Sequence, residues 1–296
     1  MYCRNTQDSI RTTQMFAQLI TLIIQCWIRI AGTTYTRSQA PWLFGPHEKG
    51  NIIGDDFFER YAALKGLEVQ RNAHDSGLIP DFKILDSLTF NASKCHPLVA
   101  EFYEKTASYK MEIWSQWYTW FSFVARIFIK IVGKEIQQLN IPLQSIETSR
   151  GMSSEVIRLV DTNDKQVYAC WFRKLVYTKK IVYAGFYTTT KVPGHDGECV
   201  KVVFPLPKGN VVVILRPETY PDGSFALVSD GKKPGGPGYY RTHYINEDKI
   251  KVKRIPLHER IHLFVDEEGV LRTDHSFHFW GIRFLLLHYK IMERRG

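Results

Sequence analysis

Residues 113–132 read IWSQWYTWFSFVARIFIKIV, and we expect this stretch to form the helix around which the chain is organised. Five of its polar side chains recur at steps of four, three, four and four residues, which places them on one narrow stripe of an α-helix. They are Ser115, Thr119, Ser122, Arg126 and Lys130. A surface helix normally has a narrow apolar stripe and a wide polar face. Because this stretch has the opposite proportions, it predicts a helix that buries most of its circumference in protein, lipid or an apolar ligand.

The same spacing of polar side chains occurs in residues 14–31. The polar residues there are Gln14, Gln18, Thr21, Gln25 and Arg29. Two helices of this kind predict either the centre of a helical layer or a pair of helices in a membrane interface. We therefore expect residues 1–143 to be mainly helical, with these two broadly apolar helices as their core.

From about residue 144 the helical periodicity stops, and short alternating segments appear between turn signals. Eleven short strands at regular spacing are typical of an antiparallel β-barrel or β-sandwich. The sequence thus predicts an α+β protein, with an N-terminal helical layer followed by an antiparallel β-domain over residues 144–296. The expected strands are 156–160, 167–177, 180–190, 200–204, 211–215, 225–228, 239–245, 249–255, 260–265, 270–279 and 282–291.

The composition describes a folded, basic protein. Its 296 residues are 44% hydrophobic and 14% aromatic, and the formal net charge is +9. A positive surface favours anionic partners such as lipid headgroups or nucleic acid. Nucleic acid is the weaker candidate, because the sequence has no zinc-finger spacing, no aromatic RNA-binding signature and no long basic run.

The cysteines and the apolar segments indicate where in the cell the protein is located. The five cysteines are scattered without a CxxC pair, which indicates reduced thiols in the cytoplasm. The apolar run 15–31 is near the lower limit for a membrane span, and Arg126 and Lys130 are costly in the middle of a bilayer. We expect a cytoplasmic protein. For the two apolar helices, burial within the protein is the first expectation, association with a membrane surface is the second, and full membrane spans are the third.

One motif suggests catalysis, although its context argues against a metal. His258-Glu-Arg-Ile-His262 matches the HExxH pattern of zinc peptidases, which requires a helix to direct both imidazoles at one metal. Pro256 precedes the motif, and apolar residues alternate out of it as in a strand. We therefore expect no zinc-peptidase site, while His262 and Asp274 stay open as an acid/base pair or as metal ligands, and the sequence identifies no cofactor.

The same residues form a plausible β-hairpin around the turn Glu267-Glu268-Gly269. That register places His262 opposite Asp274 and His258 opposite His278. A carboxylate opposite an imidazole fixes its tautomer and raises its basicity, as a general base or a metal ligand requires. The four residues are the candidate catalytic groups. The alternative interpretation is a polar face that meets water, as half-polar hairpins usually do.

The predicted core side of this hairpin is mostly apolar. It carries Ile261, Leu263, Val265, Leu271, Thr273, His275 and Phe277. A second, weaker candidate for function is His195-Asp196, which lies in a predicted turn.

The sequence supports two main hypotheses about function. The first is that the protein binds or carries a lipid or another apolar small molecule, with a membrane surface as a further expected partner. The ligand-binding residues would be Trp114, Trp117, Tyr118, Phe121 and Arg126. The alternative is an enzyme, such as an isomerase, cyclase or hydrolase, that acts on an apolar substrate through His262 and Asp274. A third possibility is an interaction protein that docks through the apolar helices.

Several stretches from residue 102 onward resemble an uncharacterised bacterial protein family. They are FYEKT at 102–106, QLNIP at 138–142, YTTTKVPG at 187–194, VKVVFPLP at 200–207 and GVLRTDH at 269–275. The resemblance implies no activity, so no functional residue is transferred from it.

Overall fold

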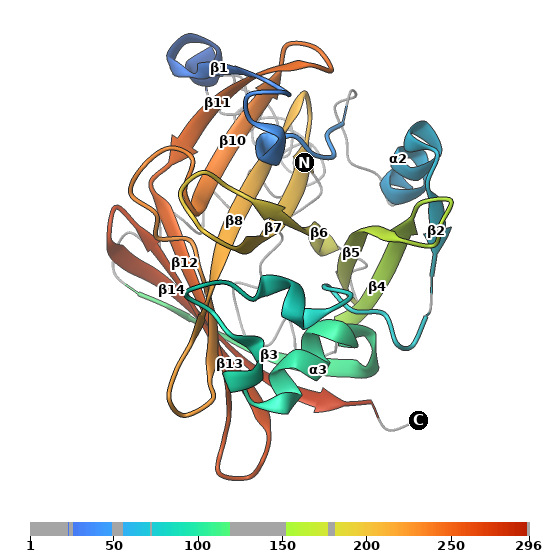
Figure 1. Ribbon diagram of the computed structural model, residues 1–296, viewed down its shortest axis with the longest axis vertical. Coiled ribbons are helices and arrows are strands. Elements are labelled where there is room, and N and C mark those ends of the chain that lie inside the picture. Colours follow the sequence, from blue (N-terminus) through green and yellow to red (C-terminus); the bar gives the residue numbers. More distant parts are fainter. Residues whose placement is uncertain are drawn as a thin grey trace, which may run out of the picture.

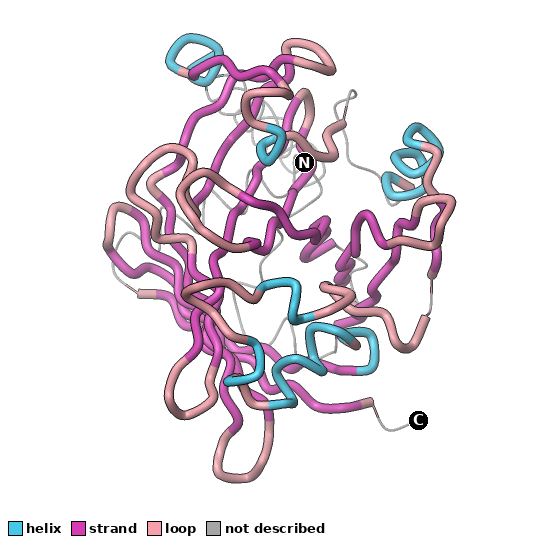
Figure 2. Tube along the Cα trace, in the orientation of Figure 1, coloured by secondary structure: helices cyan, strands magenta, loops and turns pink. Residues whose placement is uncertain are grey.

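The computed structural model describes residue 23 and residues 26–48, 56–71, 73–118, 152–176 and 181–294. Over these residues the protein is predominantly antiparallel β-structure, and its helices are short (Figures 1 and 2). The predicted α+β class with an N-terminal helical layer is therefore wrong. The described N-terminal part contributes three strands to the same sheet as the C-terminal part. The predicted domain boundary near residue 143 lies outside the described residues.

Fourteen strands of the described chain form one sheet. They are β1 (Thr33–Thr36), β2 (Glu68–Gln70), β3 (Tyr109–Trp117), β4 (Met152–Val160), β5 (Gln166–Leu175), β6 (Ile181–Lys191), β7 (Glu198–Leu206), β8 (Gly209–Thr219), β9 (Phe225–Val228), β10 (Gly238–Tyr244), β11 (Lys249–Ile255), β12 (Leu257–Val265), β13 (Leu271–Phe279) and β14 (Ile282–Glu293). The helices are α2 (Phe57–Lys65) and α3 (Pro97–Glu104), with 3-10 turns η1 (Pro41–Leu43), η2 (Phe82–Leu85), η3 (Ala92–Lys94) and η4 (Thr106–Ser108).

Strand β8 is the point at which the sheet branches. Its first half pairs with β10, where Gly238 lies opposite Ile214, and its second half pairs with β9, where Arg216 lies opposite Val228. One branch continues through β10 and β11 to β1, and the other through β9, β12, β13 and β14 to β3. Figure 1 shows β12 and β14 on one side of the molecule and β4 and β5 on the other.

The C-terminal strands match the sequence pattern closely. All eleven predicted strands are present, with ends that shift by a few residues. The predicted hairpin is confirmed in its register, with His262 opposite Asp274 and His258 opposite His278. Gly269 adopts the left-handed conformation, with φ of 74°, which the three-residue turn requires.

The predicted helix over residues 113–132 is wrong where it can be compared. Residues 113–117 belong to β3, which pairs with β14 along its whole length. The physical reason is that apolar and polar side chains alternate along this segment from residue 109 onward. Tyr109, Met111 and Ile113 face the core. Lys110 and Glu112 face outward. Residues 119–132 lie outside the described residues.

The second predicted helix, over residues 14–31, can be compared only in part. Residues 26–31 are helical, with Ile28 fully buried and Ile30 84% exposed, and most of the predicted helix lies outside the described residues. Helix α2 ends at Gly66, which adopts the left-handed conformation. Helix α3 begins with Pro97 in its first turn and ends at Glu104.

The two faces of the sheet carry separate hydrophobic cores. The inner core joins β4–β8 to β12–β14 and β3 and is covered by α3 and η2. Its members include Val156, Trp171, Val202, Val213, Leu263, Leu271, Leu285 and Tyr289. The outer core lies between the other face of β4–β8, with β10 and β11, and the segment that holds η1 and α2. Its members include Trp42, Leu43, Phe57, Phe58, Phe172, Phe186, Val212 and Ile250.

Within the described residues, no helix combines the length and the apolar character that a bilayer span needs.

Candidate functional site

The inner core contains a buried carboxylate that bonds to a histidine. Glu259 on β12 and His275 on β13 face inward because they share the strand parity of Ile261 and Phe277. The Nε2 atom of His275 lies 2.8 Å from Oε2 of Glu259, and the two side chains are 13% and 7% exposed. A carboxylate in such a setting needs hydrogen-bond partners, because burial of an unpaired charge is costly.

Tyr239 on β10 is the second partner of Glu259. Burial raises the pKa of Tyr239 well above its usual value, and the charge of Glu259 and a hydrogen bond to it act in the same direction. The phenol therefore stays protonated and donates to the carboxylate. Glu259 is thus held between a phenol and an imidazole contributed by different strands.

Arg173 on β5 lies in the same interior and is 5% exposed. Its guanidinium lies over the rings of Trp171, at 5.2 Å, and Tyr289, at 5.8 Å. Burial lowers the pKa of Arg173, and the neighbouring phenols oppose this effect. In the described chain its Nε atom makes no hydrogen bond, and no Asp or Glu oxygen lies within 4.0 Å of its nitrogens. Arg173 is therefore a buried cation whose neighbours are aromatic rings.

Two tyrosines of β6 complete what we call the inner polar cluster. The hydroxyl groups of Tyr183 and Tyr187 are 2.5 Å apart, and burial raises both pKa values well above the usual range. The charge of Glu259 also acts on both phenols. Burial raises the pKa of Tyr289 to about 12, although Arg173 lowers it. The inner polar cluster comprises Arg173, Tyr183, Tyr187, Tyr239, Glu259, His275 and Tyr289.

Partly buried apolar side chains pack against the inner core that contains this cluster. They come mainly from β3, β11, β12 and β13: Met111, Trp117, Ile255, Leu257, Ile261, Val265, Phe277 and Phe279. Ligand sites in proteins combine such apolar walls with a few fixed polar groups. The arrangement can hold an apolar molecule by its side and a polar head by the cluster.

The predicted pair of His262 and Asp274 lies on the opposite face of the hairpin. The two residues are register partners, yet each hydrogen-bonds to a different group. Nε2 of His262 lies 2.9 Å from Oγ of Ser224, and Oδ1 of Asp274 lies 2.7 Å from Nδ1 of His288. Burial lowers the pKa of His262, with Arg260 acting in the same direction and Asp274 against it. Their catalytic role stays a prediction.

His258 and His278 also face away from the inner core, beside each other on β12 and β13. Nδ1 of His258 lies 2.8 Å from the carbonyl oxygen of Ser229. Burial lowers the pKa of His278, and Arg283 and His258 add to that effect. Because β12 is a strand, Glu259 points away from both histidines of the HExxH pattern, unlike the glutamate of a zinc-peptidase helix.

The predicted ligand-binding residues separate onto two faces. Trp117 faces the inner core, with its ring 6.4 Å from that of Phe284. Trp114 faces outward and is 44% exposed. The guanidinium of Arg283 lies 4.5 Å from the ring of Tyr118. Phe121 and Arg126 lie outside the described residues. In the His195-Asp196 turn, Nδ1 and Oδ1 are 3.7 Å apart.

Sequence reasoning missed the inner polar cluster, although part of the signal was present. His275 was assigned to the core side, and Glu259 has the parity of Leu257 and Ile261, so a carboxylate and an imidazole share an inward face. Arg173 gives no such signal, because it is followed by Lys174 and two adjacent basic residues are typical of the solvated end of a strand.

Comparisons with known proteins give one distant relative. No protein-family model matches the chain, and no solved structure matches it. The chain is 23% identical over 252 residues to a Bacillus subtilis (strain 168) protein named "Uncharacterized membrane protein YndJ". The match covers 81% of this chain and 41% of the relative, so the chain spans less than half of that protein's length. The chain is thus similar to an uncharacterised bacterial protein, which confirms the resemblance expected from the sequence and brings no activity with it.

Proposed function

We propose that the protein binds and carries a lipid or another apolar small molecule with an acidic head. The head lies against Arg173, and the apolar part lies on the inner face of the sheet. The observation that carries the proposal is that Arg173 is buried with aromatic neighbours and, within the described chain, without a carboxylate partner.

The energetics favour an anionic head at this position. Removing a charge from water costs several kcal/mol even after the protein relaxes, by order of magnitude. Cation–π contacts with Trp171 and Tyr289 return about 2 kcal/mol each. A carboxylate of the ligand supplies the missing counter-charge and can accept from Nε, which has no partner in the described chain.

The partly buried apolar side chains support the second half of the proposal. Ile261 and Phe277 face the interior beside Glu259 and His275, so an apolar chain on them lies next to the polar cluster. Covering such side chains stabilises a complex by about 25 cal/mol per Å² of apolar surface. The membrane-protein name of the Bacillus relative supports a membrane as the source of such a ligand.

Glu259 and His275 favour a second candidate function, an acid/base reaction on the bound molecule. A carboxylate that holds an imidazole in one tautomer is the arrangement of a general base. An isomerase, cyclase or hydrolase would use this pair within the same interior. If the protein converts a ligand, the Glu259→Gln variant loses turnover while it retains ligand binding.

The binding proposal can be tested with oleate as the probe. Titration is followed by intrinsic tryptophan fluorescence, because Trp171 lies beside Arg173. We expect Arg173→Met to weaken oleate binding at least about tenfold, since a charge-assisted hydrogen bond contributes about 1.5–3 kcal/mol. Arg173→Lys should retain part of the affinity.

The matched control is Arg272→Met, which removes an arginine from the outward face of β13, where it pairs with Asp266 at 2.7 Å. Equal affinities of the wild-type protein and Arg173→Met would contradict the proposal. Extraction of the purified protein with organic solvent, followed by mass spectrometry, identifies the natural ligand.

A further inference from the structure

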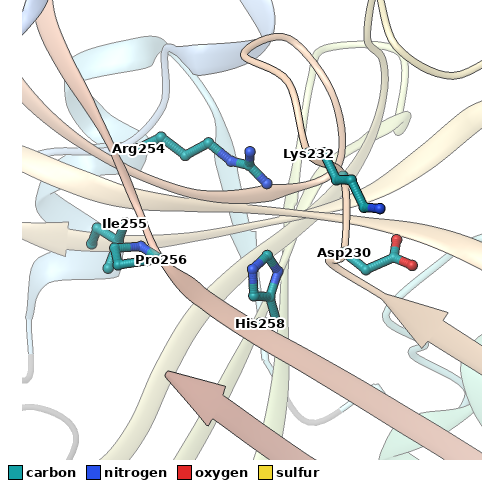
Figure 3. A pocket seen from close by; sticks show the side chains of 7 residues that line it. Asp230, Lys232, Arg254, Ile255, Pro256 and His258 are labelled. Atoms are coloured by element: carbon teal, nitrogen blue, oxygen red, sulfur yellow. The ribbon is translucent and has the colours of Figure 1, made fainter. Parts of the chain in front are cut away.

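A second site is a pocket beside the junction of β11 and β12. It has a volume of about 450 Å³ and lies between the glycine-rich loop 231–238 and the junction of the two strands. Figure 3 shows the side chains that line it: Asp230, Lys232, Arg254, Ile255, Pro256 and His258. Pockets of a few hundred Å³ are the size that small organic ligands fill.

Two cations dominate the lining of this pocket. Figure 3 shows Arg254 reaching across the pocket above the His258 ring, with Lys232 on the side of Asp230. The carboxylate in the lining, Asp230, is held by Arg216 through hydrogen bonds of 3.0 and 2.9 Å. Arg216 also contacts Glu218 at 2.6 Å, so these three groups together carry one negative charge against the two cations. The net charge of these groups is therefore positive.

Arg254 is placed for a ligand rather than for the fold. In the described chain its Nε atom is buried without a hydrogen bond, and its Nη2 atom has only a long contact, 3.5 Å, with the carbonyl oxygen of Pro237. A Cβ at Gly238 would lie 3.0 Å from Nε and 3.1 Å from Nη2. The glycine therefore leaves room for the guanidinium, whose fixed fork suits an oxyanion.

His258 and the two apolar residues define the rest of the ligand. Nδ1 of His258 lies 2.8 Å from the carbonyl oxygen of Ser229 and so carries a hydrogen, which leaves Nε2 of the neutral ring as an acceptor for a hydroxyl group. Ile255 and Pro256 form an apolar wall. An inorganic ion would leave this wall uncovered, whereas a phosphate joined to a small organic group would cover it.

We propose that this pocket binds a phosphate monoester, with its phosphoryl oxygens on Arg254 and Lys232 and its organic part on Ile255 and Pro256. The same chemistry occurs in a free glycerol phosphate and in the headgroup of phosphatidic acid. No member of the inner polar cluster lines this pocket, so the proposal does not depend on the ligand of that cluster.

The test measures binding of glycerol phosphate by calorimetry and co-sedimentation with phosphatidylcholine vesicles that do or do not contain phosphatidic acid. We expect Arg254→Gln and Lys232→Gln to lower the affinity at least about tenfold. Lys249→Gln removes the same charge from the exposed start of β11 and should leave the affinity unchanged. Because Lys232 is exposed, its substitution tests the site even if Arg254→Gln fails to fold.

The two arms distinguish the sources of the phosphate. Binding of soluble glycerol phosphate supports a free metabolite, and binding confined to vesicles with phosphatidic acid supports a lipid headgroup. The proposal is overturned if the wild-type protein binds neither probe, or if Lys249→Gln weakens binding as much as Lys232→Gln does.

Discussion

The two faces of the sheet both bury cations, but they satisfy them differently. On the outer face, Nζ of Lys201 donates to the carbonyl oxygen of Phe44 at 2.5 Å. On the inner face, Arg173 lies against aromatic rings and has a buried nitrogen without a partner in the described chain.

We interpret this difference as one between a structural cation and a cation that we propose binds a ligand. The carbonyl group that accepts from Lys201 belongs to Phe44, so this outer lysine fastens the N-terminal segment to the sheet. The inner cation has spare hydrogen-bonding capacity in a largely apolar setting. We interpret that capacity as room for an anionic ligand, because native interiors seldom leave a buried donor without a partner.

The largest effect is expected on the outer face, from the titration of Lys201. Burial lowers the pKa of Lys201 from its ordinary value of 10.5 to about 7, with Arg37 acting in the same direction. Between pH 7 and 10 the unfolded chain binds the proton and the folded protein does not, so stability rises with pH. At about 1.4 kcal/mol per pKa unit the change is on the order of several kcal/mol.

Urea unfolding at pH 7 and pH 10 measures this effect. We expect Lys201→Met to flatten the pH dependence and to raise stability most at pH 7, where the charged lysine is least favourable. Lys249→Met, on the exposed start of β11, serves as the control. Parallel pH profiles for the wild-type protein and Lys201→Met would refute the structural role of the outer cation.

The next effect is on the inner face, where Glu259→Ala removes the partner of both His275 and Tyr239. We expect a loss of about 3 kcal/mol in the free energy of unfolding, because the substitution leaves two buried side chains without their hydrogen-bond partner. Glu267→Ala, in the exposed hairpin turn, should change stability by less than about 0.5 kcal/mol. Urea denaturation compares the two, and equal losses would show that Glu259 is not an interior partner.

The smallest effect concerns the two tryptophans of β3. Trp114 faces outward and is 44% exposed, whereas Trp117 faces the inner core. We expect Trp114→Ser to leave oleate affinity within about twofold of the wild-type value, and Trp117→Ser to weaken it by more, because only the second substitution removes apolar surface from the inner face. Fluorescence titration checks this. If Trp114→Ser lowers the oleate affinity more than Trp117→Ser does, the ligand lies on the outer face instead.

The local alternation of apolar and polar residues was sufficient to predict the C-terminal strands and the register of the hairpin. The alternation from Ile261 to Val265 and the left-handed Gly269 fix which residues face each other, so His262 was correctly placed opposite Asp274. The same parity placed His275 on the core side, and it would have placed Glu259 there as well.

Long-range pairing could not be read from the sequence. Residues 113–117 fit a helical stripe when taken together with residues 118–132, and their strand becomes evident only with Lys110 and Glu112 and with the partner β14, far along the chain. Arg173 does not stand out in the sequence, because its significance depends on β5 and β14 meeting across the interior, where its guanidinium reaches Tyr289. Nothing local specifies that approach.

The most direct test of an acidic ligand on the inner face is carbon NMR of bound oleate with an isotopically labelled carboxyl carbon. In the wild-type protein we predict one bound resonance whose titration midpoint lies below that of oleate in phosphatidylcholine vesicles, because the guanidinium of Arg173 favours the ionised head. In Arg173→Met this downward shift should disappear. The absence of a bound resonance in the wild-type protein, or the same midpoint in both proteins, would contradict the binding of an acidic head by Arg173.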